Sequence, residues 1–277
     1  MRREGWHHAL DVQMDFHKWS STREGQLFHY GVAIAQFTDG KADVDIPEDV
    51  VETAMVTSRH IQESLWRGDT MFITAEMQQL ILAASQDLPD EAVVLDPTVL
   101  MSDYGFVMFE HPIVGEDRNG NPIATNAMLW GTILVSPPKD GEDPTRACVL
   151  YFLTDPFEEL DRYNEAFREP FVKRGLPLPV LALSHLFPWE FETGIDYEKR
   201  GIRGMDVILD QVKFFLAMQM LSHQAIGEPV QMRPDRATRK RFARTYPDLP
   251  EKLITLITLR RKSVKHDKEP GTVEWQR

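Results

Sequence analysis

The chain has 277 residues, of which 42% are hydrophobic and 27% are charged, and it contains 15 Phe, 6 Trp and 6 Tyr. This amount of core material excludes a chain that is disordered throughout, and 16 Gly with a single Cys exclude the collagen-like and disulfide-scaffold classes. The formal net charge is −12, and the length allows one large domain or two modest ones.

The single cysteine, Cys148, permits no intramolecular disulfide and no zinc site built from several cysteines. It precedes an apolar run, which predicts a small buried residue rather than a reactive thiol. No run approaches the ~20 apolar residues of a membrane span, and the charged start of the chain lacks the apolar stretch of a secretory signal. We therefore expect a soluble, cytoplasmic protein that has no membrane partner.

The N-terminal part of the chain predicts helices with little strand. The first 25 residues show no clean period and should be partly helical or irregular, whereas residues 33–37 predict a short strand before the turn pair Asp39-Gly40. A helix is predicted from Pro47 to Gly68, because proline and two acidic residues open it and apolar residues recur at helical spacing. A second helix is predicted from Thr74, its N-cap, to Pro89.

The middle of the chain predicts strands joined by hairpins. Apolar runs at 106–109, 128–135 and 147–153 alternate with dense turn signals at 117–122 and 137–141. Short polar connections of this kind favour antiparallel pairing over helical crossovers.

The next segments predict two helices with one strand between them. A helix is expected over 155–170, ending at Pro170, and a strand over 178–186. Residues 203–226 predict a long helix that is apolar on two faces and ends at Gly227, so it should lie in the core.

A short basic helix capped by Asp235 and a strand over 253–262 complete the chain. The sequence thus predicts an α+β fold: an antiparallel sheet of at least four strands with packed helices and a long buried helix near 203–226.

Positive and negative charges are distributed unevenly along the chain. Residues 1–228 hold 18 Lys and Arg against 37 Asp and Glu, a net charge of −19, whereas residues 229–268 hold 12 against 4, a net charge of +8. We therefore expect an acidic body over 1–228 and a basic C-terminal segment over 229–277, as an appendage or small subdomain.

Clustered cations in the basic segment are the strongest functional signal in the sequence, because Arg and Lys neutralise phosphates and release counterions. Two aromatic residues, Phe242 and Tyr246, could stack on bases. Three interpretations are open: the segment contacts nucleic acid, it folds back on the acidic body, or it binds an acidic protein partner. The predicted nucleic-acid-binding residues are Arg236, Arg239, Lys240, Arg241, Arg244, Arg260, Arg261 and Lys262.

Other chemistry is only weakly indicated. No glycine-rich phosphate loop is present, and four N-terminal histidines (His7, His8, His17 and His29) lie near Asp11 and Asp15 without the spacing of a metal site on a predicted helix. We expect no metal and no cofactor. The carboxylate pair Asp206 and Asp210, and His185 beside Ser184, could do acid–base work, but sequence does not define their geometry, so catalytic residues stay unassigned.

The run Leu256 to Lys262, followed by Val273-Glu274-Trp275, resembles a segment of uncharacterised proteins of actinobacteria and their phages. The resemblance covers about the last 25 residues and implies no activity. From the residues alone we expect a non-enzymatic regulatory or accessory protein that contacts nucleic acid through residues 233–265. The alternatives are an intracellular enzyme with its site in the acidic body, and a protein-interaction module.

Overall fold

The computed structural model describes residues 5–37, 48–89, 99–116, 122–135, 145–156, 165–186, 205–224 and 227–259. Within these ranges a 3₁₀ turn (Trp6–His8) precedes seven α-helices: α1 (Ala9–Ser20), α2 (Arg23–Phe37), α3 (Glu48–Arg67), α4 (Ala75–Asp87), α5 (Glu165–Arg174), α6 (Met205–Ser222) and α7 (Arg236–Thr245). The described strands are β1 (Asp69–Ile73), β2 (Tyr104–Glu116), β3 (Pro122–Val135), β4 (Thr145–Thr154), β5 (Leu178–Leu186), β6 (Gly227–Met232) and β7 (Ile254–Leu259).

All seven described strands form one mixed sheet in the order β5-β4-β3-β2-β1-β7-β6. Strands β2 to β5 pair antiparallel with their neighbours in chain order, which confirms the predicted α+β fold and its antiparallel sheet of at least four strands. Strand β1 is parallel to both β2 and β7, and β6 is antiparallel to β7. Helix α4 lies between β1 and β2 in the chain and supplies the helical crossover that a parallel pair requires.

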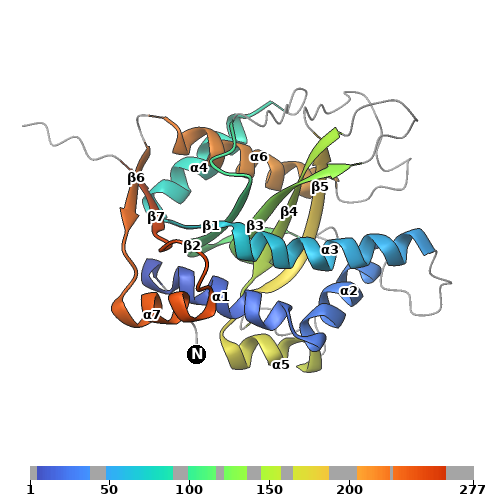
Figure 1. The fold of residues 1–277 in the computed structure, drawn as a ribbon. Coiled ribbons are helices and arrows are strands. Elements are labelled where there is room, and N and C mark those ends of the chain that lie inside the picture. The colour runs from blue at the N-terminus through green and yellow to red at the C-terminus, as the bar shows by residue number, and fades with distance from the viewer. Residues whose placement is uncertain are drawn as a thin grey trace, which may run out of the picture.

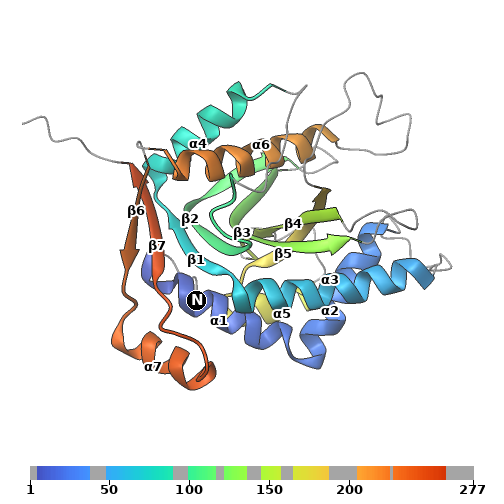
Figure 2. The ribbon, with the colours of Figure 1, turned by 45° about the horizontal axis from the view of Figure 1, so that its top comes forward.

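Helices cover the sheet on both faces (Figures 1 and 2), with α4 and α6 on one side and α1 and α3 on the other. Successive residues of the central strands therefore point into two different cores. In β4, Cys148, Leu150 and Phe152 face the α4–α6 side, whereas Val149 and Tyr151 face the α1–α3 side. A strand buried on both faces has a continuous apolar sequence, which is why these runs do not alternate with polar residues.

Helix α6 is buried along its middle, as its two apolar faces predicted. Phe215 is fully buried, and its ring meets that of Trp130 edge-on with the centroids 5.6 Å apart. The close approach of Trp130 also explains a glycine in the adjacent strand, because a Cβ on Gly105 would lie 2.1 Å from the indole.

Polar groups connect α1 to the end of α3. Gln13 is buried, and its Nε2 donates to the carbonyl oxygens of Leu65 at 2.8 Å and of Gly68 at 2.7 Å. The ammonium group of Lys252 also donates to the Gly68 carbonyl. Burial lowers the pKa of Lys252 to about 8, with Asp69 acting in the opposite direction. These donors satisfy carbonyls at the C-terminal end of α3 that have no partner within the helix.

Two predictions in the N-terminal part were wrong or incomplete. Residues 33–37, predicted as a strand, belong to helix α2, and residues 5–25 include all of α1 and the start of α2. Helix α1 lacks an apolar stripe because it is buried on several sides, and its buried residues include the polar Gln13 and Ser20.

The prediction that a helix over 155–170 ends at Pro170 was also wrong. Helix α5 begins at Glu165 and continues through Pro170 to Arg174, while residues 157–164 lie outside the described part of the chain. The residue after the proline, Phe171, is fully buried, and its ring lies 4.6 Å from that of Trp19 and 4.8 Å from that of Phe28. This packing outweighs the backbone hydrogen bond that a proline removes from a helix.

Strands β1 and β6 were not predicted. Each is only five or six residues long, and β6 contains Pro229. Strand β6 lies at the edge of the sheet, where a residue without a backbone N–H is tolerated. Strands β6 and β7 add to the same sheet as the strands of the acidic body, so the predicted boundary at residue 228 stays a prediction about charge distribution rather than about separate folding.

Replacing Phe215 by alanine should lower the free energy of unfolding by about 3–5 kcal/mol, because it opens a cavity against Trp130. The control is Met220→Ala on the same helix, where the side chain is 43% exposed and the loss should stay below ~1 kcal/mol. Urea unfolding followed by circular dichroism would compare the two variants, and equal losses would contradict the assignment of Phe215 to the core.

Candidate functional site

The basic helix α7 begins where the sequence predicted, at Asp235. The Asp235 carboxylate accepts hydrogen bonds from the backbone N–H groups of Ala237 at 2.6 Å and Thr238 at 2.9 Å. The bond from Thr238 makes the largest contribution to holding the pKa of this carboxyl below its ordinary value. A charged N-cap therefore starts a helix that otherwise carries five cations in ten residues.

One face of α7 is docked on α1 by charged groups. The Arg241 guanidinium lies 2.5 Å from an Asp11 carboxylate oxygen and 3.2 Å from one of Asp15, and it also donates to the Asp11 carbonyl at 3.1 Å. The Thr238 hydroxyl donates to the Asp11 carboxylate at 2.9 Å. Asp11 and Asp15 are four residues apart, so they lie on the same face of α1 and can share one guanidinium.

Aromatic groups continue this docking. Phe242 is buried against the α1–α3 side of the sheet, and the Tyr246 hydroxyl lies 2.7 Å from Nδ1 of His17. Burial raises the pKa of Tyr246 to about 12 and lowers the pKa of His17. The phenol therefore keeps its proton at neutral pH, and the two side chains are joined by one hydrogen bond.

Two further cations are paired with Glu251, which lies before β7. The Arg233 guanidinium binds the Glu251 carboxylate through two nitrogens, at 3.0 and 2.9 Å, and Arg239 approaches it at 3.6 Å. Hydrogen bonding from Arg233 is the largest cause that lowers the pKa of Glu251. Part of the basic segment is thus neutralised by acidic residues of the same chain.

The remaining cations of α7 point outward. Arg236, Lys240 and Arg244 recur every four residues, are exposed, and form no ion pair with any residue that the structure describes. We call these three residues the outer stripe of α7. Arg260, Arg261 and Lys262, the other predicted binding residues, lie outside the described residues.

Two of the four histidines considered as metal ligands, His17 and His29, make other contacts in the structure. His29 is buried among Phe16, Trp19 and Phe28, and its Nε2 lies 2.9 Å from the Ser20 hydroxyl. Burial lowers the pKa of His29 to about 3. Across the described ranges, no three His, Cys, Asp or Glu side chains lie close enough together to hold a metal ion. The carboxylates near these histidines, Asp11 and Asp15, bind Arg241 instead.

A buried polar cluster on α3 was not predicted from sequence. His60 is 4% exposed, its Nδ1 lies 2.7 Å from the Tyr151 hydroxyl, and burial lowers its pKa to about 4. Its Nε2 and the hydroxyl of Ser64, one turn later, find no hydrogen-bond partner among the described residues. Both atoms lie over Gly131, where a Cβ would be 2.7 Å from Nε2 and 2.3 Å from the hydroxyl oxygen. The spacing of His60 and Ser64 was the only available signal.

Of the other acid–base candidates, only Asp210 has a side chain that the structure describes. Asp210 is exposed on α6, and Ser184 and His185 lie in β5, opposite Val149 and Cys148 of β4. The side chains of Asp206, Ser184 and His185 are outside what the structure describes.

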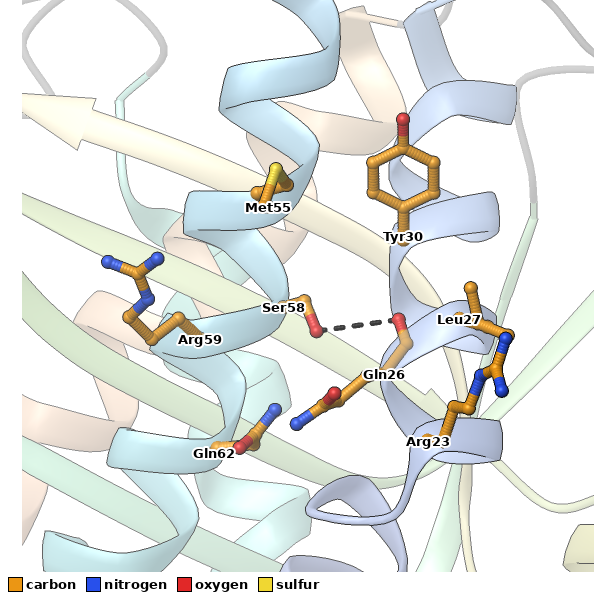
Figure 3. Close-up of a pocket in the computed structure, with 8 residues that line it drawn as sticks. All are labelled: Arg23, Gln26, Leu27, Tyr30, Met55, Ser58, Arg59 and Gln62. Atoms are coloured by element: carbon orange, nitrogen blue, oxygen red, sulfur yellow. Dashed lines mark hydrogen bonds between the residues drawn. The ribbon is translucent and has the colours of Figure 1, made fainter.

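A groove of about 550 Å³ lies between α2 and α3 (Figure 3). Gln26 and Gln62 point toward one another across it, and the Ser58 hydroxyl approaches the Gln26 carbonyl at 3.5 Å. Arg23 and Arg59 lie at its opposite edges. Sequence reasoning missed this groove because helix α2 was not predicted, and because a groove between two helices depends on how they pack.

Comparison with known proteins does not assign the chain to a family. The chain matches no protein-family model, and no curated protein is similar to it in sequence. Among the helices of the described chain, none is both long and apolar enough to cross a membrane.

Arg241→Ala should lower the free energy of unfolding by about 1 kcal/mol or more, because Asp11 and Asp15, both partly buried, lose a shared partner. Lys240→Ala, the matched control from the outer stripe, should change it by less than ~0.5 kcal/mol. Urea unfolding measures both. A Lys240 variant as unstable as the Arg241 variant would contradict the division of α7 into a docked face and an outward face.

His60→Gln should flatten the dependence of stability on pH below neutrality. The pKa of folded His60 is lowered to about 4, so between pH 6.5 and 4 the unfolded chain binds a proton that the folded chain does not. The contribution of His60 to the free energy of unfolding is therefore fully present above pH 6.5. It is lost as the pH falls toward 4, by about 1.4 kcal/mol per pH unit for one histidine.

The measurement is urea unfolding at pH 7, 6, 5 and 4.5 for wild type, His60→Gln and His223→Gln. His223 is exposed after the end of α6, so its replacement should leave the slope unchanged. Equal slopes for all three proteins would show that His60 is protonated as readily in the folded protein as in the unfolded chain.

Proposed function

We propose that the protein is a non-enzymatic regulatory or accessory protein that contacts nucleic-acid phosphates through the outer stripe of α7. The observation that carries the proposal is the arrangement of Arg236, Lys240 and Arg244: one exposed line of cations without ion pairs among the described residues. Their spacing of four residues places them on one helix face, and eight residues of helix rise by ~12 Å. Three cations over that length can contact neighbouring phosphates of one strand.

The docked face of α7 supports the same proposal. Arg241 and Thr238 hold the helix against α1, so the outer stripe is presented on a fixed element rather than on a flexible tail. A preorganised surface loses less conformational entropy on binding than a disordered segment does. Arg239 and Arg241, which the sequence also predicted as contacts, are engaged in ion pairs and have a positioning role in this proposal. Arg260, Arg261 and Lys262 follow β7 and stay predicted contacts.

The charge of the rest of the chain limits the affinity. A net charge of −19 over residues 1–228 repels phosphate at distances up to the Debye length, which is ~10 Å at 0.1 M salt. Binding should therefore be weak at physiological salt and tighter at low salt. With about three phosphate contacts, the logarithm of the affinity should fall with the logarithm of salt concentration with a slope of about −2 to −3.

The test measures binding to short fluorescent RNA and DNA at salt concentrations from about 20 to about 200 mM, a range over which counterion release changes the affinity strongly. Arg236→Ala, Lys240→Ala and Arg244→Ala combined should abolish most of the binding and flatten the salt dependence, with stability unchanged. The control combines Lys173→Glu and Arg174→Ala on α5, which changes the net charge by the same amount at a different site and should retain the wild-type slope.

Three outcomes contradict the proposal. Absence of binding to either nucleic acid at the lowest salt removes it. Equal losses in the α7 variant and the α5 control would mean that overall charge, not the outer stripe, governs binding. Binding of an acidic polypeptide such as poly-glutamate more tightly than RNA or DNA would assign the stripe to an acidic protein partner instead.

A further inference from the structure

The groove between α2 and α3 has exposed apolar side chains that the fold itself does not use. Of the eight large hydrophobic side chains that are exposed in the described chain, four lie on these two helices: Leu27, Met55, Val56 and Trp66. Leu27 and Met55 are 59% and 53% exposed, and both line the groove. Helices normally turn such residues toward the core, so Leu27 and Met55, which face each other across a groove in solvent, are available for a contact.

The edges of the groove are positively charged. Arg23 on α2 and Arg59 on α3 lie on opposite sides of it (Figure 3), and neither forms an ion pair with another described residue. Two acidic neighbours on these helices are neutralised elsewhere: Glu63 pairs with Arg67 at 2.8 Å, and Glu24 approaches Arg174 at 3.8 Å. A cationic groove on a chain with a net charge of −12 is complementary to an acidic occupant.

The shape of the groove fits a helix. Arg23, Leu27 and Tyr30 follow one another at spacings of four and three residues along α2, and Met55, Arg59 and Gln62 do the same along α3. Each set therefore forms a line along its own helix. Two packed helices have axes ~8–10 Å apart, and the side chains of a third helix can insert into the groove between them.

We propose that the α2–α3 groove docks an amphipathic acidic helix of a partner protein. The apolar stripe of that helix lies on Leu27 and Met55, and the carboxylates on its two flanks bind Arg23 on one side and Arg59 on the other. Helix-in-groove recognition uses this combination of apolar anchors and flanking charges. The site is on different helices from the outer stripe of α7, so it stands whether or not the protein contacts nucleic acid.

The probe for the test is a fluorescent, side-chain-stapled helical peptide with leucines at i, i+4, i+7 and i+11 and glutamates on both flanks of that stripe. Two control peptides replace the glutamates by lysines or the leucines by alanines. Fluorescence anisotropy with the full-length protein measures binding. The acidic peptide should bind at micromolar concentrations, and each control peptide should bind at least about tenfold more weakly, a difference of about 1.4 kcal/mol.

Charge reversal makes the test specific to the groove. Arg23→Glu with Arg59→Glu should weaken binding of the acidic peptide at least tenfold and should create binding of the lysine-flanked peptide. The control, Lys18→Glu with Lys173→Glu on α1 and α5, changes the net charge equally through two exposed residues and should retain the wild-type preference. Leu27→Ala with Met55→Ala should weaken binding of the acidic peptide to the otherwise wild-type protein and binding of the lysine-flanked peptide to the charge-reversed protein. All of these side chains are exposed, so the melting temperature should stay unchanged.

The proposal is overturned if the acidic peptide does not bind saturably, or if the reversed protein binds it as tightly as wild type does. It is also overturned if sedimentation shows a dimer of the full chain that Leu27→Ala with Met55→Ala dissociates. The occupant of the groove would then be a second copy of this chain rather than a partner helix.

Discussion

Strands β1 to β4 bury side chains on both faces, and the positions of the helices follow from this constraint. Each strand presents alternate residues to two cores, so apolar surface is removed from water only if helices cover both sides of the sheet. Helices α4 and α6 cover one side, and α1 and α3 cover the other (Figure 2). Helix α1, which packs against the sheet, α2, α3 and α7, is thereby buried on several sides and becomes the platform for α7.

The interaction of Arg241 with Asp11 and Asp15 decides what α7 can do. It commits one face of a strongly basic helix to the acidic body and leaves the opposite face in solvent. Nearby carboxylates of the same chain therefore neutralise Arg233, Arg239 and Arg241, whereas the cations of the outer stripe keep their charge. Folding back on the acidic body is thus seen for Arg241, whereas Arg236, Lys240 and Arg244 of the same helix stay exposed.

The candidate site was only partly predictable from sequence. The N-cap Asp235, the basic helix and the buried Phe215 followed from local rules, because capping and helical spacing depend on neighbours in the chain. The division of α7 into two faces could not be predicted, because it depends on Asp11 and Asp15, which are more than 220 residues away in sequence. The His60 cluster was missed for the same reason, because Tyr151 lies 91 residues after His60. The α2–α3 groove was missed because helix α2 itself was not predicted.

The sequence by itself determined the α+β class, the strands of the antiparallel part, the buried helix α6 and the location of the basic segment. These properties follow from periodicity, capping and composition, which are local. Only the tertiary structure decided that residues 33–37 are helical, that Pro170 lies inside α5, and that β1 joins β7 to the rest of the sheet. Packing of distant residues sets the last two features, because burial of apolar side chains outweighs the small backbone preferences that sequence rules measure.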